Sequence, residues 1–152
     1  MTGQGSGSDL DLQVRQLGGC QIVRLAGEVD LSNAGKLQYL LCAEAEHGHV
    51  VVDLSHVELL DAVALSALLA ARKRAAVLGT SLRLAGGHGD LVRMLQSSGL
   101  DAALDHHSDI SDAVEAALGE RDAATRHRVY SGTGDQRRPS VYRGRPPDDV
   151  RP

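Results

Sequence analysis

Residues 50–54, VVVDL, are the apolar run that most constrains how this chain can fold. A continuous run of β-branched residues is typical of a central strand that is covered on both faces, as in sheets flanked by helices. After a polar stretch, Asp61 precedes an alanine-rich segment with helical spacing, which reaches about residue 78 and is stopped by Gly79. The sequence therefore predicts an α/β fold in which a buried strand leads into a long helix capped by Asp61.

The segments around this unit add a hairpin, two short strands and three helices. Residues 10–17 alternate apolar and polar side chains, Gly18-Gly19 is a turn signal, and residues 20–31 return as a second strand. Ser32 is expected to cap the next helix, which has Leu37, Leu40 and Leu41 on one face and ends at Gly48. A strand over 81–85 follows, and then a helix over 90–98 that is capped by Asp90 and closed by Gly99.

The last expected elements are a short strand near Ala102–Leu104 and an amphipathic helix over 108–120. The apolar face of this helix consists of Ile110, Ala113, Val114, Ala117 and Leu118.

The periodicity defines one domain. We expect residues 1–8 to be a flexible Gly/Ser-rich N-terminus, residues 9–120 to be the folded domain, and residues 121–152 to be a disordered tail rich in Arg, Pro and Gly. With no Phe and no Trp in the chain, Leu, Val, Ala and Ile have to fill the core. Residues 1–120 carry 8 Lys+Arg and 16 Asp+Glu, a net charge of −8, whereas residues 121–152 carry 8 Arg and 4 Asp, a net charge of +4. An acidic folded domain argues against nucleic acid as its partner.

Nothing in the sequence indicates export or membrane insertion. The first residues do not resemble a signal peptide, and no apolar run is long enough to cross a bilayer. Cys20 and Cys42 form no CxxC pair, and we expect two buried, reduced thiols. A cytoplasmic protein is therefore predicted, while its oligomeric state stays open.

The sequence also lacks a recognisable catalytic or metal-binding arrangement. No Ser/His/Asp order, carboxylate pair or metal cluster stands out, so we expect no enzyme activity, no cofactor and no metal. Residues 86–90, GGHGD, are best interpreted as a loop with a helix cap, since they lack the Lys-Ser/Thr of a phosphate-binding loop. The histidines are expected to be solvated loop residues: His47, His49, His56, His106 and His107.

Several motifs, in order and with consistent spacing, resemble the STAS family of bacterial anti-sigma-factor antagonists. They are GEVDL (27–31), VVVDLSHVELLD (50–61), the helix to Lys73, the step from Gly79 to Leu82, and LQSSGL (95–100), and the resemblance covers about residues 9–120. It implies a small mixed β-sheet with helices packed mainly on one face.

The resemblance also implies a function. Family members bind an anti-sigma factor that is itself a serine kinase of the histidine-kinase-like ATPase fold, and this frees the sigma factor. Phosphorylation of a serine at the start of the second helix turns binding off. The family pattern there is Asp-Ser-Ser-Gly-Leu, and this chain has Asp61-Ala62-Val63-Ala64-Leu65. The acceptor position is thus Val63, which has no hydroxyl.

The switch position would then lie within a partner-binding surface. Helical spacing puts Ala64, Leu68, Ala71, Ala75 and Leu78 on the core side of this helix, with Leu65 flanking. The expected contact residues are on the opposite side and at the helix start: Asp61, Ala62, Val63, Ser66, Ala70, Lys73 and Val77.

Simpler interpretations compete with this surface. Asp61 can be a helix cap alone, and Ser66 a solvated helix serine, although it is the nearest hydroxyl to the lost acceptor. In the tail, Arg137-Arg138-Pro139-Ser140 resembles a site for a basic-directed kinase. Two other functions stay open: a STAS subunit of an ABC-type membrane transporter assembly, and a degenerate scaffold that has lost its switch.

Overall fold

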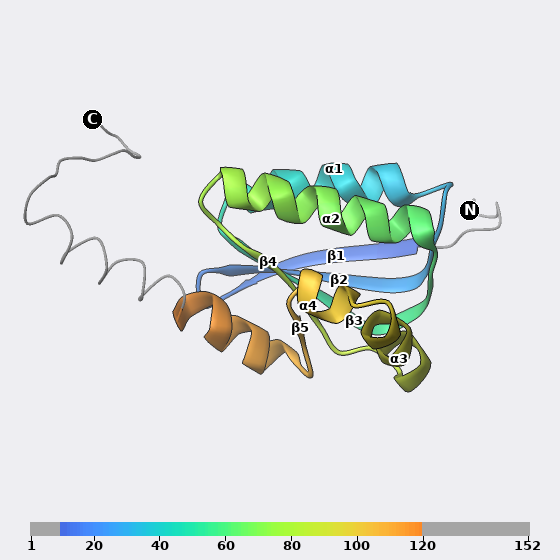
Figure 1. Cartoon of the computed structure of the whole chain (residues 1–152). Helices are drawn as coiled ribbons and strands as arrows, with labels where there is room; N and C mark the ends of the chain where they lie inside the picture. Colours follow the sequence, from blue (N-terminus) through green and yellow to red (C-terminus); the bar gives the residue numbers. More distant parts are fainter. Residues whose placement is uncertain (1–9, 120–152) are drawn as a thin grey trace, which may run out of the picture. The chain divides into compact units, whose positions relative to one another are not determined.

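The computed structural model describes residues 10–119, whose strands form one five-stranded mixed sheet (Figure 1). The spatial order is β1-β2-β3-β4-β5; β1 pairs antiparallel with β2, and all other neighbours are parallel. The predicted N-terminal segment 1–8 and tail 121–152 lie outside the described residues. The strands are β1 (Leu10–Leu17), β2 (Cys20–Val29), β3 (His49–Leu60), β4 (Leu82–Ala85) and β5 (His106–His107).

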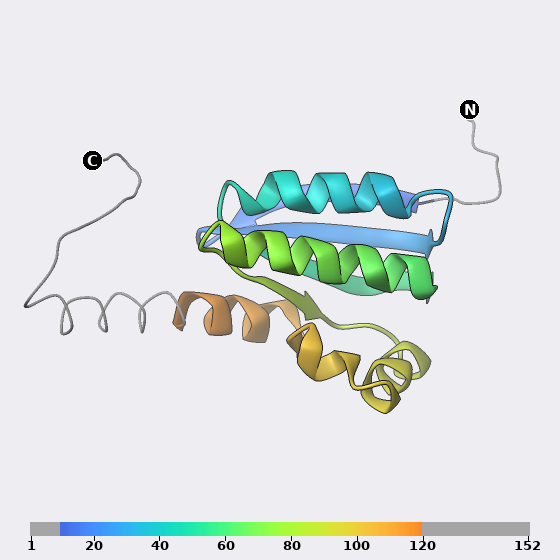
Figure 2. The same ribbon diagram turned by 45° about the horizontal axis from the view of Figure 1, so that its top comes forward.

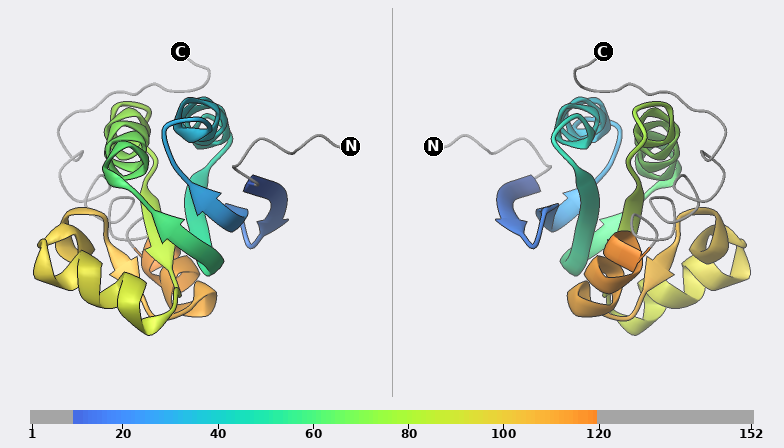
Figure 3. Two further views of the ribbon diagram at one scale, coloured as in Figure 1. Left: turned by 90° about the vertical axis from the view of Figure 1, so that its right-hand side faces the viewer. Right: turned by 90° about the vertical axis from the view of Figure 1, so that its left-hand side faces the viewer.

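The helices pack mainly on one face of this sheet. Helices α1 and α2 lie side by side across that face, as Figures 1, 2 and 3 all show. A further helix runs over residues 110–119, and its residues 110–117 lie on the opposite side, next to β4 and β5 (Figures 1 and 3). The predicted α/β class, with a small mixed sheet, is confirmed. The four other helices are α1 (Ala34–Ala45), α2 (Ala62–Val77), α3 (Gly89–Ser97) and α4 (Leu100–Ala103).

Aliphatic side chains alone build the core between the sheet and the two long helices. Val50, Val52 and Leu54 of β3 are fully buried, and each follows the previous one by two residues, which puts all three on the helix side of the strand. Leu37 of α1 and Leu68 of α2 are buried opposite them in the same cluster. The residues between them on β3 are buried as well, so the interpretation of VVVDL as a strand covered on both faces is confirmed.

Strand β3 is longer than the VVVDL run predicted. It continues through the polar stretch to Leu60, because its second half pairs with the end of β2, where Glu28 lies opposite Leu59 and Val29 opposite Leu60. The register between β2 and β3 shifts twice, between Arg24 and Ala26 and between Gly27 and Glu28. Such irregularities add a residue and turn side chains, which hides the alternation that marks a strand.

Two predicted helix caps were wrong. Ser32 is not the cap of α1, because its hydroxyl donates to Asp30 Oδ1 at 2.6 Å within the preceding turn; the cap position is Asn33. Helix α3 begins after His88, whose Nδ1 accepts a hydrogen bond from the Leu91 N–H at 3.1 Å. Asp90 therefore lies in the first turn of α3, where it pairs with Arg93.

The expected strand near Ala102–Leu104 is instead the short helix α4 and the start of a turn, and the strand follows as β5. Asp105 connects the turn after α4 to β5 and has a φ of +50°.

His106 and His107 are half-buried residues of β5. His49 is buried at the start of β3, where its Nδ1 accepts a hydrogen bond from the Ser81 N–H at 3.1 Å. For these three histidines the interpretation as solvated loop residues was wrong. His56 is exposed as expected, but it lies within β3 rather than in a loop, and its Nε2 is 2.9 Å from Arg24 Nη2. Across residues 10–119, none of the helices combines the length and apolar character that crossing a bilayer requires.

Candidate functional site

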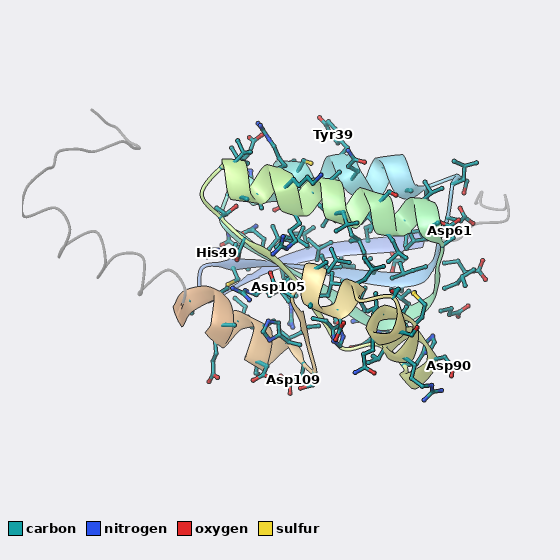
Figure 4. The ribbon with its side chains drawn as sticks, in the orientation of Figure 1. Tyr39, His49, Asp61, Asp90, Asp105 and Asp109 are labelled. Carbon is teal, nitrogen blue, oxygen red and sulfur yellow. The ribbon has the colours of Figure 1, made fainter. Side chains whose placement is uncertain are left out.

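The junction between β3 and α2 lies at the edge of the sheet where the parallel strands end. Because β2, β3 and β4 run in the same direction, the loops that lead from them into α1, α2 and α3 gather at this edge, which is where sheets of this kind bind their ligands. Asp61 and Asp90 lie at this end of the molecule in Figure 4, and His49 lies at the other end. The junction is thus exposed to a partner from the end of the sheet.

Asp61 connects the strand to the helix with three hydrogen bonds. Its Oδ1 accepts from the Ala64 N–H at 2.9 Å, which caps the helix, and its carbonyl oxygen accepts from the Leu65 N–H at 3.0 Å. Its own N–H donates to the Val29 carbonyl of β2 at 3.2 Å. The predicted cap is confirmed, and it fixes the first turn of α2 to the end of two strands.

Val63 lies in that first turn with its side chain open to solvent. Its exposed fraction is 41%, Ala62 is exposed beside it, and Ala64 is fully buried. The segment from Asp61 to Leu65 contains no Ser, Thr or Tyr. A phosphoryl group therefore has no hydroxyl to attach to at this turn, and the nearest one belongs to the exposed Ser66.

The outward stripe of α2 has the exposure that its spacing predicted. Ser66, Lys73 and Val77 are exposed and Ala70 is half-buried, whereas the core side is buried at Ala64, Leu68, Ala71 and Ala75. Leu78, predicted to be core, is 37% exposed, because it is the C-cap residue where the helix already ends. Ala67 is buried although it was not assigned to the core.

Two exposed leucines at the same edge were not identified from the sequence. Leu31, in the loop between β2 and α1, is 76% exposed, and Leu59, near the end of β3, is 51% exposed. Leu31 was expected inside a strand that in fact ends at Val29. The Leu59-Leu60 pair did carry a signal, because consecutive strand residues point to opposite faces and only one of the two can enter a single core.

Acidic side chains accompany these apolar residues. Glu58 is exposed next to Leu59, Asp30 precedes Leu31, and Asp61 is half-buried two residues before Val63. The edge thus combines exposed hydrocarbon with negative charge. Such a surface suits a protein partner with apolar anchors and basic residues around them.

Other candidate chemistry does not gather here. The interpretation of residues 86–90 as a loop with a helix cap is confirmed, although His88 supplies the cap. Cys20 is buried as expected, whereas Cys42 is only half-buried, and neither of them belongs to a disulfide within residues 10–119. Within residues 10–119, no three His, Cys, Asp or Glu side chains come together in a way that could hold a metal ion.

Comparison with known proteins agrees with this geometry. The sequence model of the family described as STAS domain matches residues 11–117. The structure resembles an anti-sigma factor antagonist from Mycobacterium paratuberculosis at 26% identity and a TM-score of 0.65, covering 72% of this chain and 95% of that one. No curated protein sequence matches this chain.

Two further solved structures share the fold at lower identity. The anti-sigma factor antagonist SpoIIAA of Bacillus, in its unphosphorylated form, has 13% identity and a TM-score of 0.59, with 72% of this chain and 97% of that chain covered. A murine anion transporter of the solute carrier 26 family has 18% identity and a TM-score of 0.58, with 69% of this chain and 18% of that chain covered.

Proposed function

The chain belongs to the STAS domain family, and from that premise we propose that it is a regulatory binding module of the anti-sigma-factor antagonist type. The likeness to the antagonist from Mycobacterium paratuberculosis supports this class. Its partner is then an anti-sigma factor of the kinase-like ATPase fold, and binding releases the sigma factor in a bacterial cytoplasm. The module has no catalytic role of its own.

One observation carries the proposal further: Val63 is exposed at the position where the family pattern has its acceptor serine. In the family, a phosphate at this position adds close to two negative charges to the first turn of the helix and ends binding. A valine cannot receive that charge. We therefore infer a module that docks without being switched off at this position.

The contact surface is centred on the start of α2. Its residues are those of the predicted set, Asp61, Ala62, Val63, Ser66, Ala70, Lys73 and Val77. Leu31 and Leu59 extend the surface toward β2 and β3. The acidic residues that neighbour this set in sequence, Asp30, Glu58 and Asp61, favour basic residues on the partner.

The test places a charge on this surface. Val63→Asp adds a carboxylate at an exposed position, so the fold should lose no more than about 0.5–1 kcal/mol. Desolvating an unpaired carboxylate in the contact should weaken binding by about 2–5 kcal/mol, where 2.8 kcal/mol is about a hundredfold in affinity. Binding to the anti-sigma factor is measured by calorimetry, and stability by urea melts.

A matched control separates the contact from the added charge. Gln96 is exposed on α3, outside the proposed surface, so Gln96→Asp adds the same carboxylate and should leave the affinity unchanged. If Val63→Asp binds as tightly as wild type while its fold is intact, the contact lies elsewhere and the antagonist proposal loses its main support.

A reciprocal variant tests the lost switch. Val63→Ser restores a hydroxyl at the acceptor position, and with ATP and the partner kinase it should become phosphorylated, whereas wild type should carry no phosphate between Asp61 and Leu65. Mass spectrometry maps the site. Phosphate on Ser66 of the wild-type protein would contradict the loss and move the switch by about one helical turn.

A second candidate function is a subunit of an ABC-type membrane transporter assembly; the murine anion transporter shows that this fold also occurs as part of a transporter chain. A degenerate scaffold without a switch partner is the remaining alternative. Affinity purification of the native protein, followed by mass spectrometry, separates the two partner classes. Recovery of a transporter ATPase in place of a kinase-like anti-sigma factor would favour this second function.

A further inference from the structure

Strand β1 forms an outer edge of the sheet, and its far side has no neighbour among the described residues. Its sequence, LDLQVRQL, contains no Pro or Lys, and its register with β2 is regular over all eight residues. Natural proteins usually protect an edge strand of this length with Lys or other charged side chains, with Pro or with a bulge, and of these β1 has only Asp11 and Arg15. An edge with a regular backbone and charges of both signs is a template for pairing with a strand of complementary charge.

The hairpin turn determines which backbone groups face outward. Gly18 and Gly19 both have positive φ, +61° and +88°, as in the two-residue turn that suits a hairpin. This turn makes Leu17 and Cys20 a hydrogen-bonded pair. Because such pairs alternate along an antiparallel ladder, the outward backbone groups of β1 belong to Leu10, Leu12, Val14 and Gln16.

The side chains of β1 carry complementary charges four residues apart. Asp11 and Arg15 are both exposed on the face of the sheet opposite α1 and α2, and neither forms an ion pair or side-chain hydrogen bond with another described residue. On the other face, Leu12 is half-buried and Val14 is 40% exposed. The strand therefore presents one acid, one base and one apolar pair around Gln13.

We propose that β1 pairs antiparallel with β1 of a second copy of this chain, with Gln13 on the two-fold axis. The outward backbone N–H and C=O groups of one β1 strand must bond to the outward groups of the other. The two-fold axis must therefore pass through a residue and not between two residues, and near the middle of the strand that residue can be Leu12, Gln13 or Val14. Only the axis at Gln13 places Asp11 opposite Arg15, twice by symmetry, and Leu12 opposite Val14, also twice. Each matched pair stabilises a sheet, and the symmetric arrangement closes as a dimer.

The surrounding elements leave room for this pairing. Helix α1 packs over β2 and β3 rather than over β1. Figure 3 shows β1 at the margin of the sheet, beyond the helix pair. The dimer continues the sheet across two chains, and it leaves the start of α2 open on both copies.

Charge reversal tests the pairing in the full-length protein. Arg15→Asp sets two carboxylates opposite each other and should shift the chain to a monomer in sedimentation velocity, and Asp11→Arg should do the same with two guanidinium groups. The double variant Asp11→Arg/Arg15→Asp restores the opposite charges and should restore the dimer. Lys36→Glu, at an exposed position of α1, is the control and should remain dimeric.

A cysteine pair tests the register independently. Residues opposite each other in a non-hydrogen-bonded pair have Cα atoms about 4.5 Å apart, which is within the range for a disulfide. Gln13→Cys should therefore oxidise to a linked dimer. Arg15→Cys places its two thiols about 13 Å apart along the strand and should not. Wild type, which keeps Cys20 and Cys42, controls for the native thiols.

The result expected is a wild-type dimer, loss and recovery of that dimer with the charge swaps, and cross-linking at position 13 only. A wild-type chain that is monomeric even at about 1 mM, the weak end of measurable association, overturns the proposal. A dimer that is insensitive to both charge reversals, or that cross-links equally at positions 13 and 15, also overturns it.

Discussion

At the scale of single residues, Asp61 combines a structural contact with a position in the proposed surface. Its Oδ1 caps α2 at the Ala64 N–H, and its backbone is bonded to β2. The cap alone accounts for an aspartate here, because Asp is among the residues that best satisfy the free N–H groups of a first turn. A role in binding therefore has to be separated from its role in stability.

Asp61→Ala should lower the free energy of unfolding by about 1 kcal/mol, within a range of about 0.5–2 kcal/mol, because the Ala64 N–H loses its acceptor. Asp61→Asn keeps an oxygen acceptor and is the control. Urea melts at high salt compare the two, since salt screens the interaction of the charge with the helix dipole. Equal losses in both variants would show that the charge, and not the cap, stabilises this junction.

At this scale, the sequence predicted periodic positions better than isolated ones. The exposure of Val63, Ser66 and Lys73 follows from helical spacing, since one face of α2 must enter the core. The caps at Ser32 and Asp90 were wrong for another reason. Before α1, the hydroxyl of Ser32 bonds to Asp30 and leaves the cap position to Asn33. Before α3, the cap is His88, a residue type that is not among the usual cap formers.

At the scale of elements, β3 shows what sequence periodicity misses. Its first half was predictable because it is continuously apolar, and its second half was not, because its side chains alternate irregularly where the register with β2 shifts. The pairing with β2 sets the length of the strand, and that information lies in another part of the chain. The same extension brings Leu59 to the proposed contact surface and explains why this exposed residue was missed.

Glycines at the ends of elements support a second prediction. Gly48, between α1 and β3, has a φ of +155°, and an added Cβ would lie 2.9 Å from the Gly19 carbonyl oxygen in the β1–β2 turn. Because the obstacle is backbone, it cannot rotate away as a side chain could. Gly48→Ala should therefore destabilise the fold by about 1–3 kcal/mol, from strain and steric overlap together.

The chain offers a matched control for this substitution. Gly35 lies in the first turn of α1 with nothing within 4 Å of an added Cβ. Gly35→Ala should stabilise the protein by about 0.4–1 kcal/mol, because alanine loses less backbone freedom on folding. Thermal melts of both variants give opposite signs if this account holds, and two shifts in the same direction would refute it.

At the scale of the whole described domain, the sheet has two faces with different coverings. The helices and the hairpin could be predicted from the sequence because each has a local hydrophobic periodicity of its own. That periodicity does not show on which face of the sheet the helix over residues 110–119 lies. Cys20, Ile22 and Val51 are buried although they point away from the α1 and α2 side, and residues 110–117 of this helix lie on their side of the sheet (Figures 1 and 3). Its own Ala113 and Ala117 are fully buried.

Two truncations of different length test where the folded domain ends. A chain ending at residue 120 keeps every described residue and should unfold cooperatively with the midpoint of the full-length protein, because the apolar periodicity stops there. A chain ending at residue 109 loses the last helix and uncovers side chains such as Ile22 and Val51, each worth about 1.5–3 kcal/mol when fully buried. A loss of only about 2 kcal/mol in the free energy of unfolding should lower the melting temperature of a domain of this size by roughly 8 °C or more.

Thermal unfolding followed by circular dichroism distinguishes the outcomes. A large fall for the chain ending at 120 would show that residues 121–152 belong to the fold, and no fall for the chain ending at 109 would show that the far face of the sheet is buried by something other than this helix.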